Sequence, residues 1–226
     1  NGNTFTHRHT LPGFVASADS TVNTSFGESI SMSKDGTTLV IGATGVDNDI
    51  QSDIGAIYIY KWDANNDSTQ SYTLDQTILS PETAINMQFG STVHMNNDAT
   101  RIVIGARGYD NARDMLFDNG KTTFDLQDTQ IIDLNSSSGG VFTATKYNDN
   151  FLLDGKLVTT NVSSHDKFGN SVFVINDTVV VGAPNDDTAV SDNSTRENDG
   201  MVGVFDLKTS GQYSWKVIET EPVLMD

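Results

Sequence analysis

The sequence contains no cysteine and only 4 prolines among its 226 residues. Without cysteine the chain can form neither disulfide bonds nor thiolate metal sites, although this leaves its cellular compartment open. No run approaches the ~18 consecutive apolar residues that a membrane helix needs, so we expect no membrane insertion in this segment. Basic residues are scarce: 13 Lys and Arg stand against 30 Asp and Glu, which gives a net charge of −17. Such an acidic surface repels phosphate backbones and argues against nucleic acid as a partner.

What the chain does contain is turn and strand chemistry. Asp, Asn, Ser, Thr and Gly, which favour turns and loops, are abundant between short apolar segments. No stretch of ten or more residues has a helical periodicity. We therefore predict an all-β protein, and its aromatic and aliphatic content is that of a globular one.

A frame of two strands and a tight turn occurs three times. The copies are FGESISMSKDGTTLVIGAT, FGSTVHMNNDATRIVIGAR and FGNSVFVINDTVVVGAP, at 26–44, 89–107 and 168–184. In each copy the first strand alternates and the second is apolar on both faces, a pattern typical of the centre of a sheet covered on both sides. From the glycine of Phe-Gly to that of Gly-Ala is 15 residues in the first two copies and 13 in the third. Three copies of one hairpin indicate a repeat architecture.

Each hairpin is followed by a third strand, and an outer strand is expected before each hairpin. This division predicts four-stranded antiparallel units at about 4–62, 70–147 and 151–208, with 213–226 as the start of a further unit. Such units must stack on neighbours, and sheets packed face to face around an axis make a β-propeller. Three blades cannot close a ring, so the segment 1–226 is expected to be part of a larger one. Either the rest lies outside this segment, or other chains complete it.

Phe-Gly, then Gly-Ala-Pro, then Gly-Ala-Ile-Tyr-Ile-Tyr (55–60) resembles the FG-GAP repeat of integrin α subunits and of bacterial surface proteins. The resemblance spans about residues 4–208 and implies a propeller used for adhesion or assembly. It also implies calcium in an Asp-rich loop between the two hairpin strands. Here that loop is only two or three residues long, at 34–36, 96–98 and 176–177, too short to supply the about 6–8 oxygens that calcium takes. We therefore expect no calcium site and no cofactor.

Most candidate site residues have structural interpretations. The glycines of the frame should allow tight turns and close packing of blades, and Phe26, Phe89 and Phe168 should anchor one blade on another. These glycines are Gly27, Gly42, Gly90, Gly105, Gly169 and Gly182. Clustered carboxylates in the long loops suit hard cations, but an Asp-rich chain places Asp in every loop. They are Asp47, Asp49 and Asp53; Asp110, Asp114 and Asp118; Asp186, Asp187 and Asp192.

Four histidines offer little for catalysis. His7 and His9 share a face of an expected edge strand but have no third ligand nearby, and His94 and His165 are isolated in the sequence. There is no nucleophile elbow and no Gly-rich phosphate loop. We therefore assign no catalytic, cofactor or metal residue and predict that the chain is not an enzyme.

The first functional hypothesis is a non-enzymatic interaction module of a secreted, cell-surface or virion-surface protein. It would mediate adhesion or assembly through rim loops, with a protein partner or by self-assembly, and its likeliest contact element is the insertion 107–138. Two alternatives stay open. One is a carbohydrate-binding appendage, for which the long loops supply Tyr109 and Phe117 as aromatics. The other is a metal-dependent enzyme with an acidic loop site.

Overall fold

The computed structural model describes residues 4, 7, 10–12, 23–48, 50–63, 71–82, 86–109, 137–158, 165–189, 195–196, 199–206 and 216–219. Every regular element in these residues is a β-strand, so the prediction of an all-β chain is confirmed. The described part contains no helix long and apolar enough to cross a membrane.

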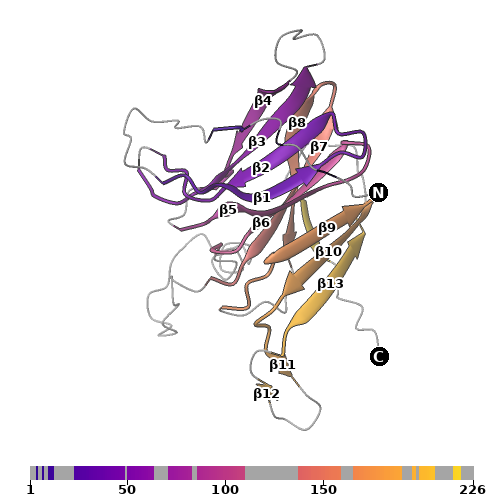
Figure 1. The fold of residues 1–226 in the computed structure, drawn as a ribbon. Helices are drawn as coiled ribbons and strands as arrows, with labels where there is room; N and C mark the ends of the chain where they lie inside the picture. Colours follow the sequence, from indigo (N-terminus) through magenta and orange to yellow (C-terminus); the bar gives the residue numbers. More distant parts are fainter. Residues whose placement is uncertain are drawn as a thin grey trace.

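The strands form three main sheets that pack face to face in succession along the chain (Figure 1). The first sheet has the order β1 (Phe26–Met32), β2 (Thr38–Ala43), β3 (Ala56–Asp63) and β4 (Ser71–Leu79). The second contains β5 (Phe89–Met95), β6 (Arg101–Ala106), β7 (Gly140–Tyr147) and β8 (Asn150–Val158). The third contains β9 (Ser171–Ile175), β10 (Thr178–Ala183) and β13 (Met201–Asp206). The strands of these units pair antiparallel with their neighbours, as expected for blades.

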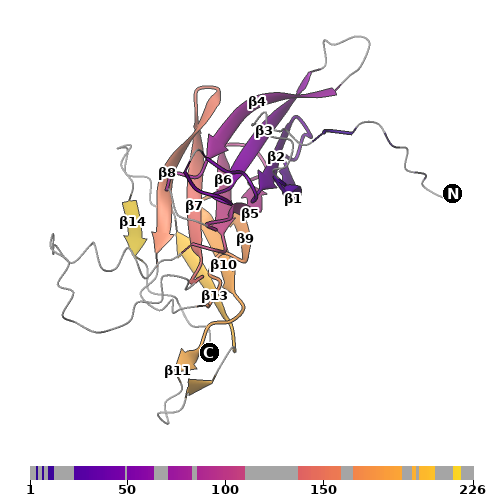
Figure 2. The ribbon, with the colours of Figure 1, turned by 90° about the vertical axis from the view of Figure 1, so that its left-hand side faces the viewer.

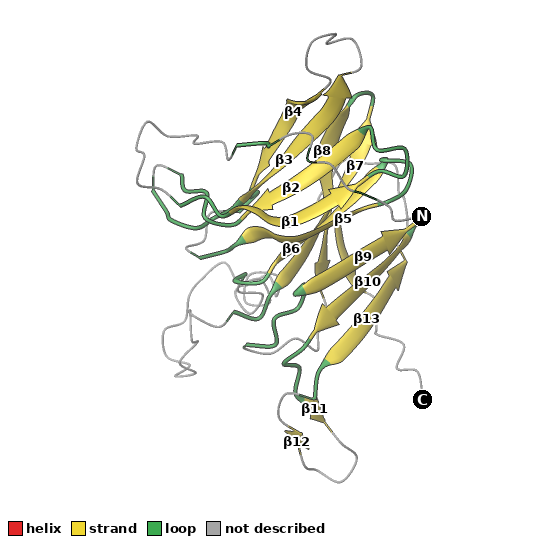
Figure 3. Cartoon of the chain, viewed as in Figure 1, coloured by secondary structure: helices red, strands yellow, loops and turns green. Residues whose placement is uncertain are grey.

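Two further pairings complete the strand list. The strands β11 (Thr188–Ala189) and β12 (Thr195–Arg196) form a short ribbon in the loop between β10 and β13 (Figure 3). The strand β14 (Lys216–Glu219) lies beside β8 and pairs with it in parallel (Figure 2). Residues 213–226 were expected to begin a further unit; their described part joins the second sheet instead.

The sheets divide the chain one strand later than the expected units 4–62, 70–147 and 151–208. The segment Tyr72–Leu79 was expected to be the first strand of the second unit, but β4 pairs along the whole of β3, from Ala56 with Leu79 to Asp63 with Ser71. The segment 151–158 likewise closes the second sheet as β8. The physical reason is the short connection: β4 follows β3 after seven residues, and strands joined so closely pair as antiparallel neighbours.

The predicted hairpin turns are present, and short polar side chains close them. At 34–37 the Asp35 carboxylate accepts hydrogen bonds from the Ser33 hydroxyl (2.6 Å) and from the Thr37 backbone N–H (3.0 Å). These bonds hold the pKa of Asp35 at about 2. In the second sheet Asp98 accepts from the Thr100 hydroxyl in the same way, at 2.7 Å. Asx chemistry of this kind is why so short a loop suffices.

The apolar cores lie between the sheets. Ile102 and Ile104 of β6 face the first sheet, where they join Val40, Ile57 and Ile59 in one buried cluster. Val103, between them, faces the third sheet and packs in a second cluster with Val179 and Phe205, among others. Side chains alternate across a strand, so a strand covered on both faces must be apolar throughout. This explains the continuous apolar second strand of the frame.

The Phe-Gly pair begins each sheet at its contact with the preceding one. Phe89 and Phe168 are fully buried and meet Phe142 and Phe205 edge to face, with ring centres 5.4 and 5.8 Å apart. The glycine after each of these two phenylalanines has a positive φ of 87°. At Gly90 the pairing register of β5 shifts, and Gly169 lies just before the start of β9. Phe89 lies in the buried cluster shared by the first and second sheets and Phe168 in the one shared by the second and third, which agrees with the predicted anchoring role. Phe26 instead packs against Tyr58 and Tyr60 of its own sheet.

The second glycine of the frame explains how tightly the sheets meet. A Cβ added to Gly42 would lie 1.9 Å from the carbonyl oxygen of Gly90, and one added to Gly105 would lie 2.2 Å from that of Gly169. A backbone carbonyl cannot move aside like a flexible side chain. At Gly182 the nearest atom is only the Ser171 hydroxyl oxygen, at 2.4 Å.

The first prediction compares these two glycines. We expect Gly105→Ala to destabilise the protein by at least about 2 kcal/mol, because overpacking displaces backbone between two sheets. The melting temperature should fall by roughly 4–8 °C. In the matched variant Gly182→Ala only a hydroxyl must rotate, so the loss should be much smaller. Thermal melts followed by circular dichroism measure both, and equal losses would contradict the sheet contact at Gly105.

Candidate functional site at the sheet interfaces

A hydroxyl group joins each sheet to the next at the same position of the frame. The Ser29 hydroxyl donates to the carbonyl of Gly90 at 2.7 Å, and the Thr92 hydroxyl donates to the carbonyl of Gly169 at 2.9 Å. Ser29 and Thr92 each lie two residues after the Phe-Gly glycine. The bond gives the crowded glycine carbonyl a partner, and a buried carbonyl without one costs free energy.

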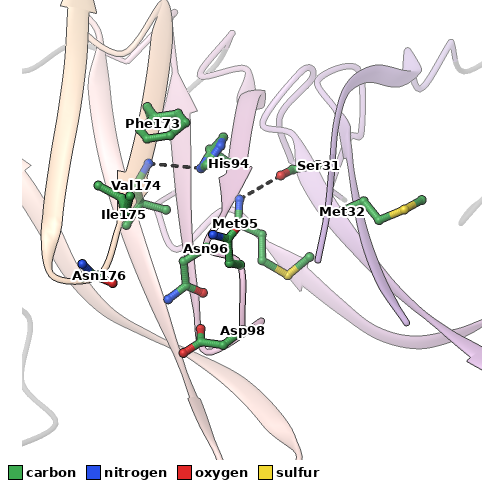
Figure 4. A pocket seen from close by; sticks show the side chains of 11 residues that line it. Ser31, Met32, His94, Met95, Asn96, Asp98, Phe173, Val174, Ile175 and Asn176 are labelled. Carbon is green, nitrogen blue, oxygen red and sulfur yellow. Dashed lines mark hydrogen bonds between the residues drawn. The ribbon is translucent and has the colours of Figure 1, made fainter. Parts of the chain in front are cut away.

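A second bond joins neighbouring inner strands two residues further along. The Ser31 hydroxyl oxygen accepts from the Met95 N–H at 2.9 Å, and the His94 Nδ1 accepts from the Val174 N–H at 3.1 Å (Figure 4). Ser31 and His94 are equivalent in the frame, as are Met95 and Val174. The histidine was isolated in the sequence; in the structure it links two sheets. Alignment of the three copies is the signal that could have found it.

His94 lies beside an aromatic ring. Its ring centre is 4.2 Å from that of Phe173, which occupies the equivalent position in the third sheet. Because Nδ1 accepts a hydrogen bond, the neutral tautomer carries its proton on Nε2. Burial lowers the pKa of His94 below its ordinary value of 6.5. The neutral form is therefore the one that holds the two inner strands together.

These residues line a cavity of about 210 Å³ at the ends of β1, β5 and β9 (Figure 4). Its wall combines Met32, Met95 and Phe173 with polar groups of the adjacent turns. Those polar groups serve the fold: Asn96 Oδ1 accepts from the N–H groups of Thr100 and Arg101. The cavity therefore offers an apolar surface and a histidine edge, but not a set of converging reactive groups.

The long loops lie at the opposite end of the strands. The connections after β2, β6 and β10 leave the same edge of the stack, away from the short turns (Figure 3). Asp47 accepts there from the backbone N–H of Asp53 at 2.8 Å, so this pair orders the first loop. In the third loop, burial and the neighbouring Asp166 and Asp187 raise the pKa of Asp186.

The carboxylates of this edge do not form a metal cluster in the described ranges. There, no group of three or more His, Asp or Glu side chains is placed to hold an ion. Five of the acidic candidates lie outside the described residues: Asp49, Asp110, Asp114, Asp118 and Asp192. Of the histidine pair, His7 lies 3.2 Å from the Thr10 hydroxyl, whereas His9 lies outside the described residues.

One buried charge escaped the sequence analysis. The Lys156 ammonium lies between the first two sheets, 3.0 Å from Glu82 Oε1 and 4.2 Å from the centre of the Tyr109 ring, and it also contacts the Tyr109 hydroxyl. Burial lowers the pKa of Lys156, while Glu82 raises it. Tyr109 was a candidate rim aromatic for carbohydrate binding; it is buried in the core instead, because its ring packs against Phe142. Phe117 lies outside the described residues.

The comparison with known families agrees with this geometry. A family model described as the FG-GAP repeat matches residues 14–60 and 152–200. The chain carries FG-GAP repeats. No curated protein matches it. The strands β5, β6 and β7 lie between the two matched segments and make the same Phe-Gly and Gly-Ala contacts, although residues 107–139 separate β6 from β7.

The second prediction concerns His94, which joins the second and third sheets. A lowered pKa means that unfolded chains bind the proton first, so stability should fall as the pH falls below about 6.5. His94→Asn keeps an acceptor at the position of Nδ1 but cannot be protonated. We expect its melting temperature to fall less between pH 8 and pH 5 than that of the wild type, by a few degrees.

The exposed His165 supplies the control for this measurement. It has a positive φ of 72°, which asparagine tolerates, so His165→Asn should keep the local backbone, and an equal effect in both variants would show that the effect is not specific to His94. An unchanged pH dependence in His94→Asn would show that this histidine does not link stability to pH.

The third prediction concerns calcium. The hairpin loops are closed by their own Asp side chains, so millimolar calcium should leave the melting temperature within error of that in chelator. A ligand that binds only the folded state raises that temperature by mass action. A clear rise, with bound ions in native mass spectra, would place a calcium site in this chain.

Proposed function

We propose that the chain is a non-enzymatic β-propeller segment that mediates adhesion or assembly through the loops of one edge. The proposal rests on one observation: the three long connections leave the same edge of sheets that are joined by equivalent contacts. A rigid stack holds loops at fixed separations, which is how scaffolds with variable loops present binding surfaces. FG-GAP repeats are generally non-enzymatic and typically occur in extracellular proteins, which supports a secreted, cell-surface or virion-surface location.

Two features of the described residues favour a protein partner over a glycan. The loop aromatic Tyr109 is directed into the core, where it cannot stack on a sugar. The loop edge carries Asp47, Asp53 and Asp187, which suit contact with a basic protein surface. Electrostatic attraction between the two surfaces would also speed their association. The insertion 107–138 is proposed as part of the same contact surface. The segment 1–226 is proposed to be one portion of a larger ring.

The fourth prediction tests this proposal with loop charges. Labelled protein is applied to an array of purified extracellular and cell-surface proteins and, in parallel, to a glycan array. We expect binding on the protein array, weakened about tenfold by the double variant Asp47→Asn, Asp187→Asn, because each change removes a charge at the loop edge. Asp47→Asn retains the acceptor for Asp53.

Asp149→Asn is the matched control. Asp149 is exposed at the turn between β7 and β8, away from the long loops, so its loss should leave binding unchanged. Binding to glycans alone would replace the proposal with the carbohydrate-binding alternative. Equal loss in the control variant would show that the effect is overall charge rather than the loop edge.

A further inference from the structure

The outer face of the third sheet repeats the features that join the first two sheets to their neighbours. Ser171 lies at the position from which Ser29 and Thr92 donate to the next glycine carbonyl, yet it is exposed and its hydroxyl makes no hydrogen bond within the described residues. Gly182 is equivalent to Gly42 and Gly105, which contact that carbonyl, but a Cβ added to Gly182 would meet only Ser171. Gly200 corresponds to Gly55 and Gly139, whose Cβ positions lie 2.1 Å from the carbonyls of Phe89 and Phe168.

Apolar side chains on that face are exposed although their counterparts are buried. Val202 corresponds in register to Ile57 and Val141, which are fully buried against the next Phe-Gly pair, but Val202 is 64 % exposed. Val204 corresponds in register to Ile59, which is fully buried, but Val204 is 38 % exposed. Val202 is therefore placed to contact a further Phe-Gly glycine, as Ile57 contacts Gly90 and Val141 contacts Gly169.

The opposite end of the stack carries the complementary features. Ile30 and Met32 of β1 are 67 % and 50 % exposed, whereas their counterparts Val93 and Met95 in β5 are 7 % and 2 % exposed. Gly27 has a positive φ of 94°, close to the 87° of Gly90 and Gly169, whose carbonyls contact a preceding sheet. The strands behind β1 are already covered, in part by Leu11, so the free surface at this end is the inner strand.

We propose that the third sheet docks the β1 strand of a second copy of this chain, head to tail. The inference rests on the proposed assembly function and names its partner. In the docked pair the Gly27 carbonyl lies against Gly182 and accepts a hydrogen bond from Ser171, and Gly27 covers Val202. A head-to-tail contact uses different surfaces on the two copies, and so it either closes a ring or continues as a filament. At the inner strands the contact repeats the glycine, hydroxyl and aliphatic groups of the internal interfaces.

The proposal is tested by the mass of the protein in solution. Sedimentation velocity of the wild type over a concentration series should show species larger than the 24.4 kDa monomer. Raised salt should favour them, because a net charge of −17 on each copy opposes association until it is screened. A single 24.4 kDa species at every concentration and salt level would overturn the proposal and leave the face to a further repeat of a longer chain.

Two charge variants distinguish head-to-tail docking from other association. Ile30→Glu removes the β1 surface and Val202→Glu removes the third-sheet surface, so each variant alone should be monomeric. Mixed in equal amounts they should form a dimer, because each retains the surface that the other lacks. Association of either variant alone, or no association of the mixture, would contradict the proposal. Both residues are exposed, and unchanged melts and circular dichroism spectra would exclude misfolding.

A third change isolates the glycine contact. Gly182→Ala should weaken association by about tenfold or more, since its methyl group would meet the partner carbonyl. Ile50→Glu is the control, because Ile50 is 88 % exposed in the loop after β2 and outside both surfaces. Array binding through the loops should persist in Ile30→Glu, so loss of docking and loss of loop binding are separable. Equal weakening in the Ile50 variant would refute the assignment of the surface.

Discussion

The structure depends on one close approach: the glycine carbonyl of the second and third Phe-Gly pairs lies against the glycine of the Gly-Ala pair in the preceding sheet. Any Cβ at Gly42 or Gly105 would overlap that carbonyl, so the approach sets how closely two sheets can pack. The hydroxyl of Ser29 or Thr92 then gives the same oxygen its hydrogen bond. Burial of Phe89 and Phe168 follows, because each ring enters the space between two sheets that the glycines have brought together. The Phe-Gly pair, the Gly-Ala pair and the hydroxyl residue, which are separate in the sequence, therefore meet at one contact between two sheets.

The two edges of the stack therefore differ in their chemistry. At one end the hairpin turns are closed by their own Asp and Ser side chains, which leaves few groups for a ligand. At the other end each connection is free to vary in length, from residues 44–55 to residues 107–139, without disturbing the sheet contact. The buried Lys156 with Glu82, and Gln76 with Phe151, add polar bonds between the outer parts of the first two sheets. Variation at one end and constancy at the other is what an interaction scaffold requires.

The sequence could predict the strands, the turns and the anchoring phenylalanines, because each depends on local pattern: alternation, Asx chemistry and a repeated aromatic. It could not place β4, because an outer strand has no motif of its own and can pair on either side of a repeat boundary. The hydrogen bond of His94 was equally inaccessible, since His94 and Val174 are 80 residues apart and their contact depends on the stacking of two units. Tyr109 was wrongly assigned to the loop surface because it follows the last residue of β6, and only its packing against Phe142 shows that it is buried.

The third sheet is not an exact copy of the other two, and the difference has a physical consequence. Ser31 and His94 each accept a backbone N–H from the next inner strand, but Phe173, at the equivalent position, has no acceptor. A neighbour docked on the third sheet can therefore receive the hydroxyl bond of Ser171 but not the second bond between inner strands. The backbone N–H on the inner strand of the docked copy would then have to donate to water, or that strand would lie slightly displaced. The junction at this face therefore lacks one part-buried hydrogen bond, a loss on the order of 1 kcal/mol. It also lacks the apolar contacts of the strands behind β1, which are already covered, so it is weaker than the junctions within the chain. Such a contact is suited to association that can reverse, while the internal contacts hold the three sheets together.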